Sequence, residues 1–138
     1  MRHQPHLELA DCRAIVAASH QAADQIEASV SIAVVDSGGH LLLMERRDCA
    51  SPASAEAAIA KARMAALNGK PTAAMEASIN SARPALLQLA GLLGQPAAAM
   101  AGGLPLLQDG ICIGAIGISG MTPDLDSAIA AAGVAALS

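Results

Sequence analysis

Ala33-Val34-Val35-Asp36-Ser37-Gly38-Gly39-His40-Leu41-Leu42-Leu43 places a pair of glycines between two apolar runs. Glycine adopts the positive φ angles that a two-residue hairpin turn requires, so Gly38-Gly39 predicts such a turn. We therefore expect an antiparallel hairpin with strands at about Val30 to Asp36 and His40 to Arg46. The apolar residues of these strands do not alternate cleanly with polar ones, which indicates a sheet covered on both faces.

A second hairpin signal lies late in the sequence, in Gly102-Gly103-Leu104-Pro105-Leu106-Leu107-Gln108-Asp109-Gly110-Ile111-Cys112-Ile113-Gly114-Ala115-Ile116-Gly117-Ile118-Ser119-Gly120. Its turn pair is Asp109-Gly110. The later glycines lie within an apolar strand and not at a strand-to-helix turn, so they do not match a dinucleotide or phosphate fingerprint. They indicate instead that a helix or a neighbouring subunit approaches the sheet closely.

Helical patterns flank and separate the two hairpins. They predict a first amphipathic helix from Leu7 to about Glu27, a second from Ser51-Pro52 to about Asn68-Gly69, two short helices around Thr72 to Asn80 and Pro84 to Leu93, and a last one beginning at Thr122-Pro123. The order α-ββ-α(αα)-ββ-α places the chain in the α+β class, with a mainly antiparallel sheet packed against α-helices. No linker or repeat divides it, so we expect a single domain over residues 1–138.

The composition limits the possible partners. Hydrophobic residues make up 54% of the chain and charged residues only 14%, which favours burial of surface in a homo-oligomer. A net charge of -4, without a lysine or arginine run, argues against a nucleic-acid partner. The chain has no Phe, Tyr or Trp, so base stacking on aromatic side chains is excluded.

Targeting and metal signals are also missing from the sequence. No apolar run is long enough to span a bilayer, and the start lacks a secretory signal, so we expect a cytoplasmic protein without membrane insertion. Cys12, Cys49 and Cys112 form no CxxC or Cys/His ligand spacing, which predicts neither a disulfide framework nor a structural metal. We interpret Cys12 and Cys112 as small core residues.

Candidate binding residues cluster around the end of the first hairpin. Glu45-Arg46-Arg47-Asp48 and Lys61 could form a solvated rim, or their cations could bind the carboxylates of a small ligand, and both interpretations remain open. His20 lies near one end of the apolar face of the first helix, where a partly buried surface residue and a ligand are both possible. No nucleophile elbow or catalytic triad can be assembled, so whether the chain is an enzyme stays open.

Several stretches together resemble the GlcG/HbpS family, the haem-binding or haem-degrading domain also found at the C-terminus of PduO-type proteins. They are Ser31 to Leu41, Arg46-Arg47-Asp48, Ala58-Ile59-Ala60-Lys61-Ala62-Arg63, Gly102-Gly103-Leu104-Pro105 and Gly114 to Gly120, with Asp126 beyond. The resemblance covers almost the whole chain. The lysine of the family's Lys-Ala-Arg-Thr pattern matches Lys61, and Met64 stands in place of the threonine.

The resemblance implies a profilin-like α+β sandwich that forms homo-oligomers, with haem or a related tetrapyrrole as a small-molecule ligand. It implies that His20 is the axial ligand of the haem iron. With this ligand, our hypothesis places Arg46, Arg47 or Lys61 near the haem propionates. A neutral imidazole is a suitable iron ligand, and Met, Leu and Ile could cover a porphyrin face without aromatic residues.

Two other functions remain as alternatives. The first is an accessory enzyme of small-acid or diol catabolism, with a cleft that contains Lys61, Arg46 and Asp36. The second is a structural oligomer without a ligand, which would have large apolar interfaces and no ligand-sized cavity.

Overall fold

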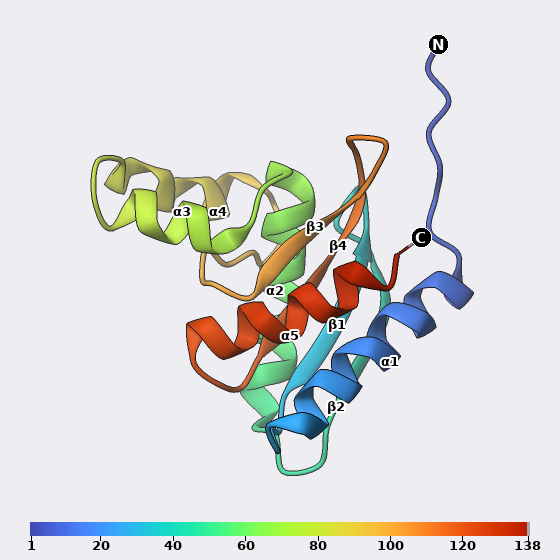
Figure 1. Ribbon diagram of the computed structural model, residues 1–138. Helices are drawn as coiled ribbons and strands as arrows, with labels where there is room; N and C mark the ends of the chain where they lie inside the picture. The colour runs from blue at the N-terminus through green and yellow to red at the C-terminus, as the bar shows by residue number, and fades with distance from the viewer. Residues whose placement is uncertain (138) are drawn as a thin grey trace.

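The computed structural model describes residues 1–137 and contains one four-stranded antiparallel sheet with helices on both faces (Figure 1). The strands are β1 (Ser31–Asp36), β2 (Leu41–Arg46), β3 (Gly103–Gln108) and β4 (Ile111–Ser119), in the spatial order β2-β1-β4-β3. The helices are α1 (Leu9–Gln25), α2 (Pro52–Asn68), α3 (Thr72–Ile79), α4 (Leu89–Leu92) and α5 (Pro123–Ala135), with a 3-10 helix, η1 (Pro84–Gln88), before α4. The expected α+β class and order of elements are confirmed.

Both faces of the sheet are covered, as the strand pattern predicts. Helices α1 and α5 lie side by side on one face, and α2 covers the other (Figure 1). In β1, Ile32 and Val34 pack toward α1 and α5, whereas Ala33 and Val35 pack against the alanines of α2. Because strand side chains alternate between the two faces, a strand buried on both faces needs apolar residues at every position.

The two hairpin turns differ from each other. Asp109 and Gly110 have φ angles of 51° and 78°, so the β3–β4 turn is the expected two-residue turn. The β1–β2 connection spans residues 37–40. The prediction of a two-residue turn at Gly38-Gly39 is therefore wrong. The carboxylate of Asp36 accepts hydrogen bonds from the backbone N–H groups of Gly38 and His40, both at 2.9 Å, and this local bonding organises a longer loop.

Glycine in β4 lets α2 approach the sheet closely. A Cβ atom added at Gly117 would lie 2.0 Å from the carbonyl oxygen of Ala58 and 2.7 Å from the backbone nitrogen of Ala62. Only a residue without a side chain fits there. This contact supports the interpretation that the strand glycines permit close approach of a helix.

The side-chain caps of two helices agree with the sequence. The Ser51 hydroxyl accepts a hydrogen bond from the backbone N–H of Ser54 at 3.2 Å, before Pro52 in the first turn of α2. The Thr122 hydroxyl does the same for Leu125 at 3.3 Å, at the start of α5. Local residue preferences therefore set both helix starts.

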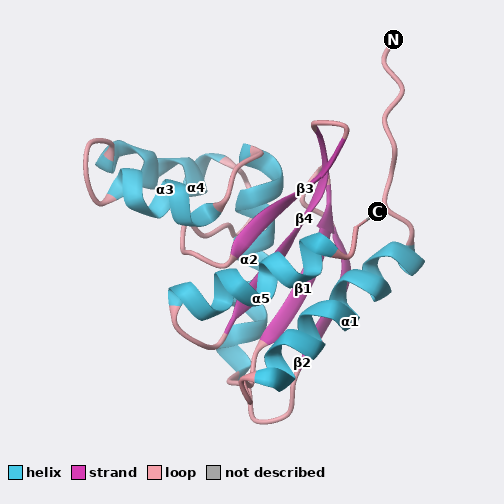
Figure 2. Cartoon of the chain, in the orientation of Figure 1, coloured by secondary structure: helices cyan, strands magenta, loops and turns pink. Residues whose placement is uncertain are grey.

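The segment of α3, η1 and α4 projects to one side of the sheet (Figure 2). The short helix expected at Pro84 to Leu93 divides into η1 and α4. No residue from 76 to 100 is buried. Among residues 1–137, no helix combines the length and apolar character needed to cross a bilayer.

Candidate functional site

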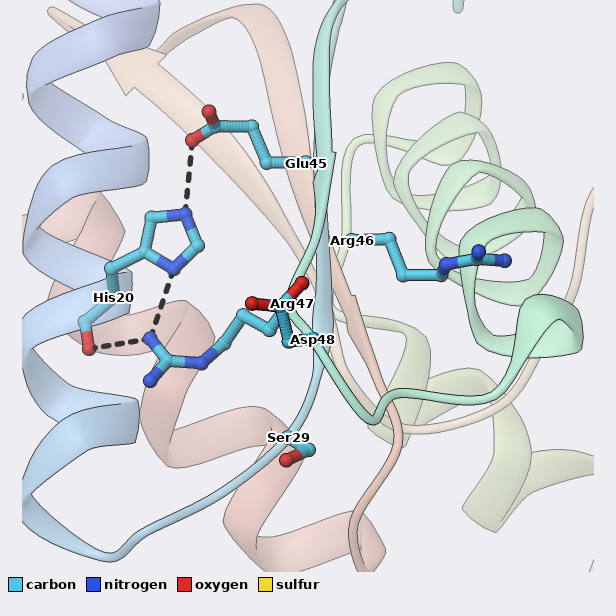
Figure 3. A pocket seen from close by; sticks show the side chains of 6 residues that line it. All are labelled: His20, Ser29, Glu45, Arg46, Arg47 and Asp48. Atoms are coloured by element: carbon cyan, nitrogen blue, oxygen red, sulfur yellow. Dashed lines mark hydrogen bonds and ion pairs between the residues drawn. The ribbon is translucent and has the colours of Figure 1, made fainter.

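A cavity of about 380 Å³ lies where the C-terminal half of α1 faces the end of β2 (Figure 3). It is lined by His20, Ser29, Glu45, Arg46, Arg47 and Asp48. Three of the four predicted binding residues therefore line one cavity.

His20 has hydrogen-bond partners on both ring nitrogens. Its Nε2 lies 2.9 Å from Oε1 of Glu45, and its Nδ1 lies 3.1 Å from Nη1 of Arg47 (Figure 3). A guanidinium group only donates hydrogen bonds, so Nδ1 accepts and the ring proton lies on Nε2, which donates to Glu45. The contacts therefore correspond to a neutral imidazole protonated on Nε2.

Arg47 is held in place by contacts to α1 and to Val30, the residue before β1. Its Nη1 donates to the backbone oxygen of His20 at 3.2 Å, and its Nη2 pairs with the carboxylate of Asp24. Its backbone N–H donates to Val30 at 3.0 Å, and its side chain is 23% exposed. These contacts connect the end of α1 to the end of β2 and give His20 a defined orientation.

Arg46 has a different orientation from Arg47. Successive strand residues point to opposite faces, so Glu45 points toward α1 and Arg46 toward α2. Figure 3 shows the guanidinium of Arg46 turned away from His20. Arg46 is exposed and lines the cavity without contacting the imidazole.

Lys61 lies outside this cavity. Its side chain is buried, and its Nζ donates to the backbone oxygen of Ile118 at 2.9 Å and to Oδ2 of Asp126 at 3.2 Å. It lines a second cavity of about 210 Å³. The structure therefore separates Lys61 from the other three predicted residues.

The small-acid cleft expected from Lys61, Arg46 and Asp36 is a wrong grouping. Arg46 pairs with Ser31 at the first residue of β1, and Asp36 is the last residue of that strand. Lys61 is buried on α2 in the second cavity. Arg46 and Asp36 therefore lie at opposite ends of β1, and Lys61 lies on α2, so the three side chains do not share a cleft.

Two partners in these sites were missed by sequence reasoning. Glu45 is two residues after the apolar Leu43, and residues two apart in a strand lie on the same face of the sheet. This spacing could have placed Glu45 on the face toward α1. Asp126, the partner of Lys61, lies 65 residues away in sequence. No local pattern signals that contact.

The cysteines occupy different environments. Cys12 is fully buried in the core, and this burial, followed by the nearby charge of Asp11, raises the pKa of its thiol. Cys112 is half-buried, so its assignment to the core holds only in part, while Cys49 is exposed. Within residues 1–137, no group of three or more His, Cys, Asp or Glu side chains is arranged to hold a metal ion.

Comparisons with known proteins agree with this fold. The sequence model of a family described as "Haem degrading protein HbpS-like" matches residues 7–135. Protein GlcG of Escherichia coli (strain K12) is 42% identical over 106 residues, which cover 77% of this chain and 75% of GlcG.

Solved structures extend the similarity to the whole fold. A double mutant of Streptomyces reticuli HbpS is 31% identical with a TM-score of 0.89, covering 100% of this chain and 91% of that one. A crystal structure of PduOC in complex with haem is 29% identical with a TM-score of 0.85, covering 96% and 95%.

Proposed function

The chain belongs to the HbpS-like family of haem degrading proteins, and we propose that it binds haem or a closely related tetrapyrrole. The observation that carries the proposal is the cavity in which His20 lies beside the guanidinium group of Arg47. The solved haem complex of the similar PduOC chain supports the same ligand class.

The side chains of this cavity fit haem in their donor chemistry. The imidazole of His20 is 27% exposed, and an imidazole in its neutral form is a common ligand of haem iron. The guanidinium groups of Arg46 and Arg47 could bind carboxylates such as propionates, but Arg46 would have to turn toward His20, and Arg47 would have to release its contacts to His20 and Asp24. When bound, haem would supply an iron centre with redox chemistry, and these residues would hold and orient it.

The cavity lacks an apolar wall for the porphyrin faces. Its six lining residues are all polar or charged. Leu41 and Leu42 are exposed at the start of β2, an edge strand whose other end, at Glu45 and Arg46, lines the cavity. We therefore propose that the protein self-associates and that a second subunit completes the binding site.

Ligation of iron by His20 requires a local rearrangement. Nε2 carries the ring proton and is bonded to Glu45, so this proton must move and the carboxylate must turn away. If the proton moves to Nδ1, that atom becomes a donor facing the donor group of Arg47, which must then shift as well. The side chain of Glu45 is 52% exposed, whereas that of Arg47 is 23% exposed and also paired with Asp24.

A titration of the purified protein with haemin, followed by visible absorption, tests the proposal. We expect saturable binding at a fixed ratio per subunit, with a histidine-ligated spectrum that is lost in His20→Ala. His40→Ala is the matched control, because it removes an exposed imidazole in the β1–β2 loop, away from the cavity. This control should keep both the spectrum and the affinity.

Weak and non-saturating binding that is the same in the wild type and in His20→Ala would overturn the proposal. Such a result would favour a structural oligomer without a specific ligand. Loss of the spectrum in His40→Ala alone would place the ligand elsewhere on the chain.

A further inference from the structure

The ammonium group of Lys61 makes two hydrogen bonds to the protein and can donate a third. An ammonium carries three N–H donors. Among residues 1–137, two acceptors are provided, the backbone oxygen of Ile118 and the carboxylate of Asp126. Lys61 is only 5% exposed and lines the cavity of about 210 Å³. A group bound in this cavity could therefore accept the third hydrogen bond.

The backbone at Gly102 lies very close to the side chain of Lys61. Gly102 has a φ angle of +124°, and a Cβ atom there would lie 3.1 Å from Nζ of Lys61 and 2.5 Å from the oxygen of Ile118. Only glycine combines this backbone conformation with so little space. The backbone at Gly102 therefore packs directly against the ammonium group of Lys61.

The cavity combines polar and apolar walls. Its polar groups are Lys61, Asp126, Glu76 and Ser119, and its walls include the side chains of Met100 and Met121. A water molecule occupies about 30 Å³ in the liquid, so a cavity of this size holds a compound of a few heavy atoms.

The charges of the cavity select the kind of ligand. One ammonium faces two carboxylates, so the lining is net negative and disfavours a further anion. Asp126 already accepts from Lys61 and from the backbone N–H of Met121 at 2.9 Å. Glu76 uses Oε2 to accept from Ala101 at 2.9 Å, which leaves Oε1 as an acceptor.

We propose that this cavity binds a small uncharged polyhydroxy compound, independently of the His20 site. One ligand oxygen accepts the third N–H of Lys61, and a ligand hydroxyl donates to Glu76. The methionine side chains cover the carbon atoms of the ligand. This proposal goes beyond haem binding and does not depend on it.

A purely structural ion pair is the competing explanation. The Lys61–Asp126 pair connects α2 to the start of α5. A buried ion pair is often no more stabilising than an apolar pair of similar size, because both charges lose their hydration. A pair with only this role predicts no specific ligand in the cavity.

Ligand-detected NMR on the full chain distinguishes the two explanations. Saturation-transfer signals are recorded for glycerol and for glycerate, which has a carboxylate in place of one alcohol group. We expect saturable glycerol binding and roughly tenfold weaker glycerate binding, because like charges repel at the net negative lining. Equal signals from both compounds, or none from glycerol, would overturn the proposal.

Variants at the cavity rim avoid the risk that a Lys61 variant fails to fold. Met100 is 46% exposed, so Met100→Trp should fold and obstruct the cavity, while Leu92→Trp, at a residue 78% exposed on α4, is the matched control. We expect Met100→Trp to abolish the glycerol signal and Leu92→Trp to keep it. The His20→Ala variant should also keep it, so failure of the haem proposal leaves this test unaffected. A glycerol signal that survives in Met100→Trp would contradict the assignment.

Discussion

His20 is hydrogen-bonded through both ring nitrogens, and these bonds determine which nitrogen carries the proton. Arg47 can only donate, which leaves the proton on Nε2, the atom that faces Glu45. Glu45 therefore competes with any metal for Nε2. At the scale of single residues, access to the proposed ligand is limited by a carboxylate on the neighbouring strand.

Replacing Glu45 by alanine should raise the affinity for haemin. The net value of a partly exposed charge-assisted hydrogen bond is about 1 kcal/mol, so its removal should lower the dissociation constant roughly fivefold. Absorption titration of Glu45→Ala measures this change. Glu56→Ala, which removes an exposed carboxylate on α2, should leave the affinity unchanged. A weaker affinity in Glu45→Ala would show that this carboxylate assists binding.

At the scale of elements, the contact between α2 and β4 depends on small residues. Gly117 lies under the backbone of α2, and the alanines Ala58, Ala62 and Ala65 pack on the same face of the sheet. This close approach also positions Lys61 on α2 beside the end of β4. The Lys61 cavity therefore depends on the spacing between helix and sheet.

Gly117→Ala should destabilise the protein strongly. The added methyl group would meet the carbonyl oxygen of Ala58 at 2.0 Å, and such overpacking should cost about 3 kcal/mol. Urea denaturation followed by far-ultraviolet circular dichroism measures it, since the chain has no Trp or Tyr for fluorescence. Gly91→Ala is the control, because a Cβ atom there has nothing within 4 Å. Equal unfolding free energies for both variants would contradict the packing argument.

At the scale of the whole molecule, the chain leaves apolar surface uncovered. Strands β2 and β3 are both edges of the sheet, and Leu41 and Leu42 on β2 are exposed. Leu87 and Leu92 are exposed on the projecting segment of η1 and α4. The His20 cavity adjoins the last residues of β2 and Leu41 and Leu42 are its first residues, so we expect a subunit contact that runs along the whole strand and completes the site.

Leu41→Glu should therefore lower both the oligomer mass and the affinity for haemin. Leu41 is 45% exposed, so a charge at this position is tolerated in the single chain and disfavoured in an interface. Sedimentation velocity measures the mass. Leu87→Glu, on the projecting segment, should leave the mass unchanged. If Leu87→Glu dissociates the oligomer and Leu41→Glu does not, the interface lies on that segment instead.

Much of the fold could be predicted because its signals are local. The turn at Asp109-Gly110, the caps at Ser51 and Thr122 and the apolar runs of the strands each act within a few residues. The β1–β2 loop was mispredicted because the Asp36 side chain competes with the tight turn that the glycines allow. Of the candidate site, His20, Arg46 and Arg47 line one cavity and Lys61 lines another, and the ligand-binding role of these residues stays a prediction.

The sequence by itself determined the α+β class, the order of the elements and the residue types that could bind a ligand. Only the tertiary structure decided which of those residues share a cavity and which way each one points. His20 meets Glu45 across 25 residues, and Lys61 meets Asp126 across 65. The physical reason is that turns and caps depend on neighbours in the chain, whereas these contacts depend on how helices pack on the sheet.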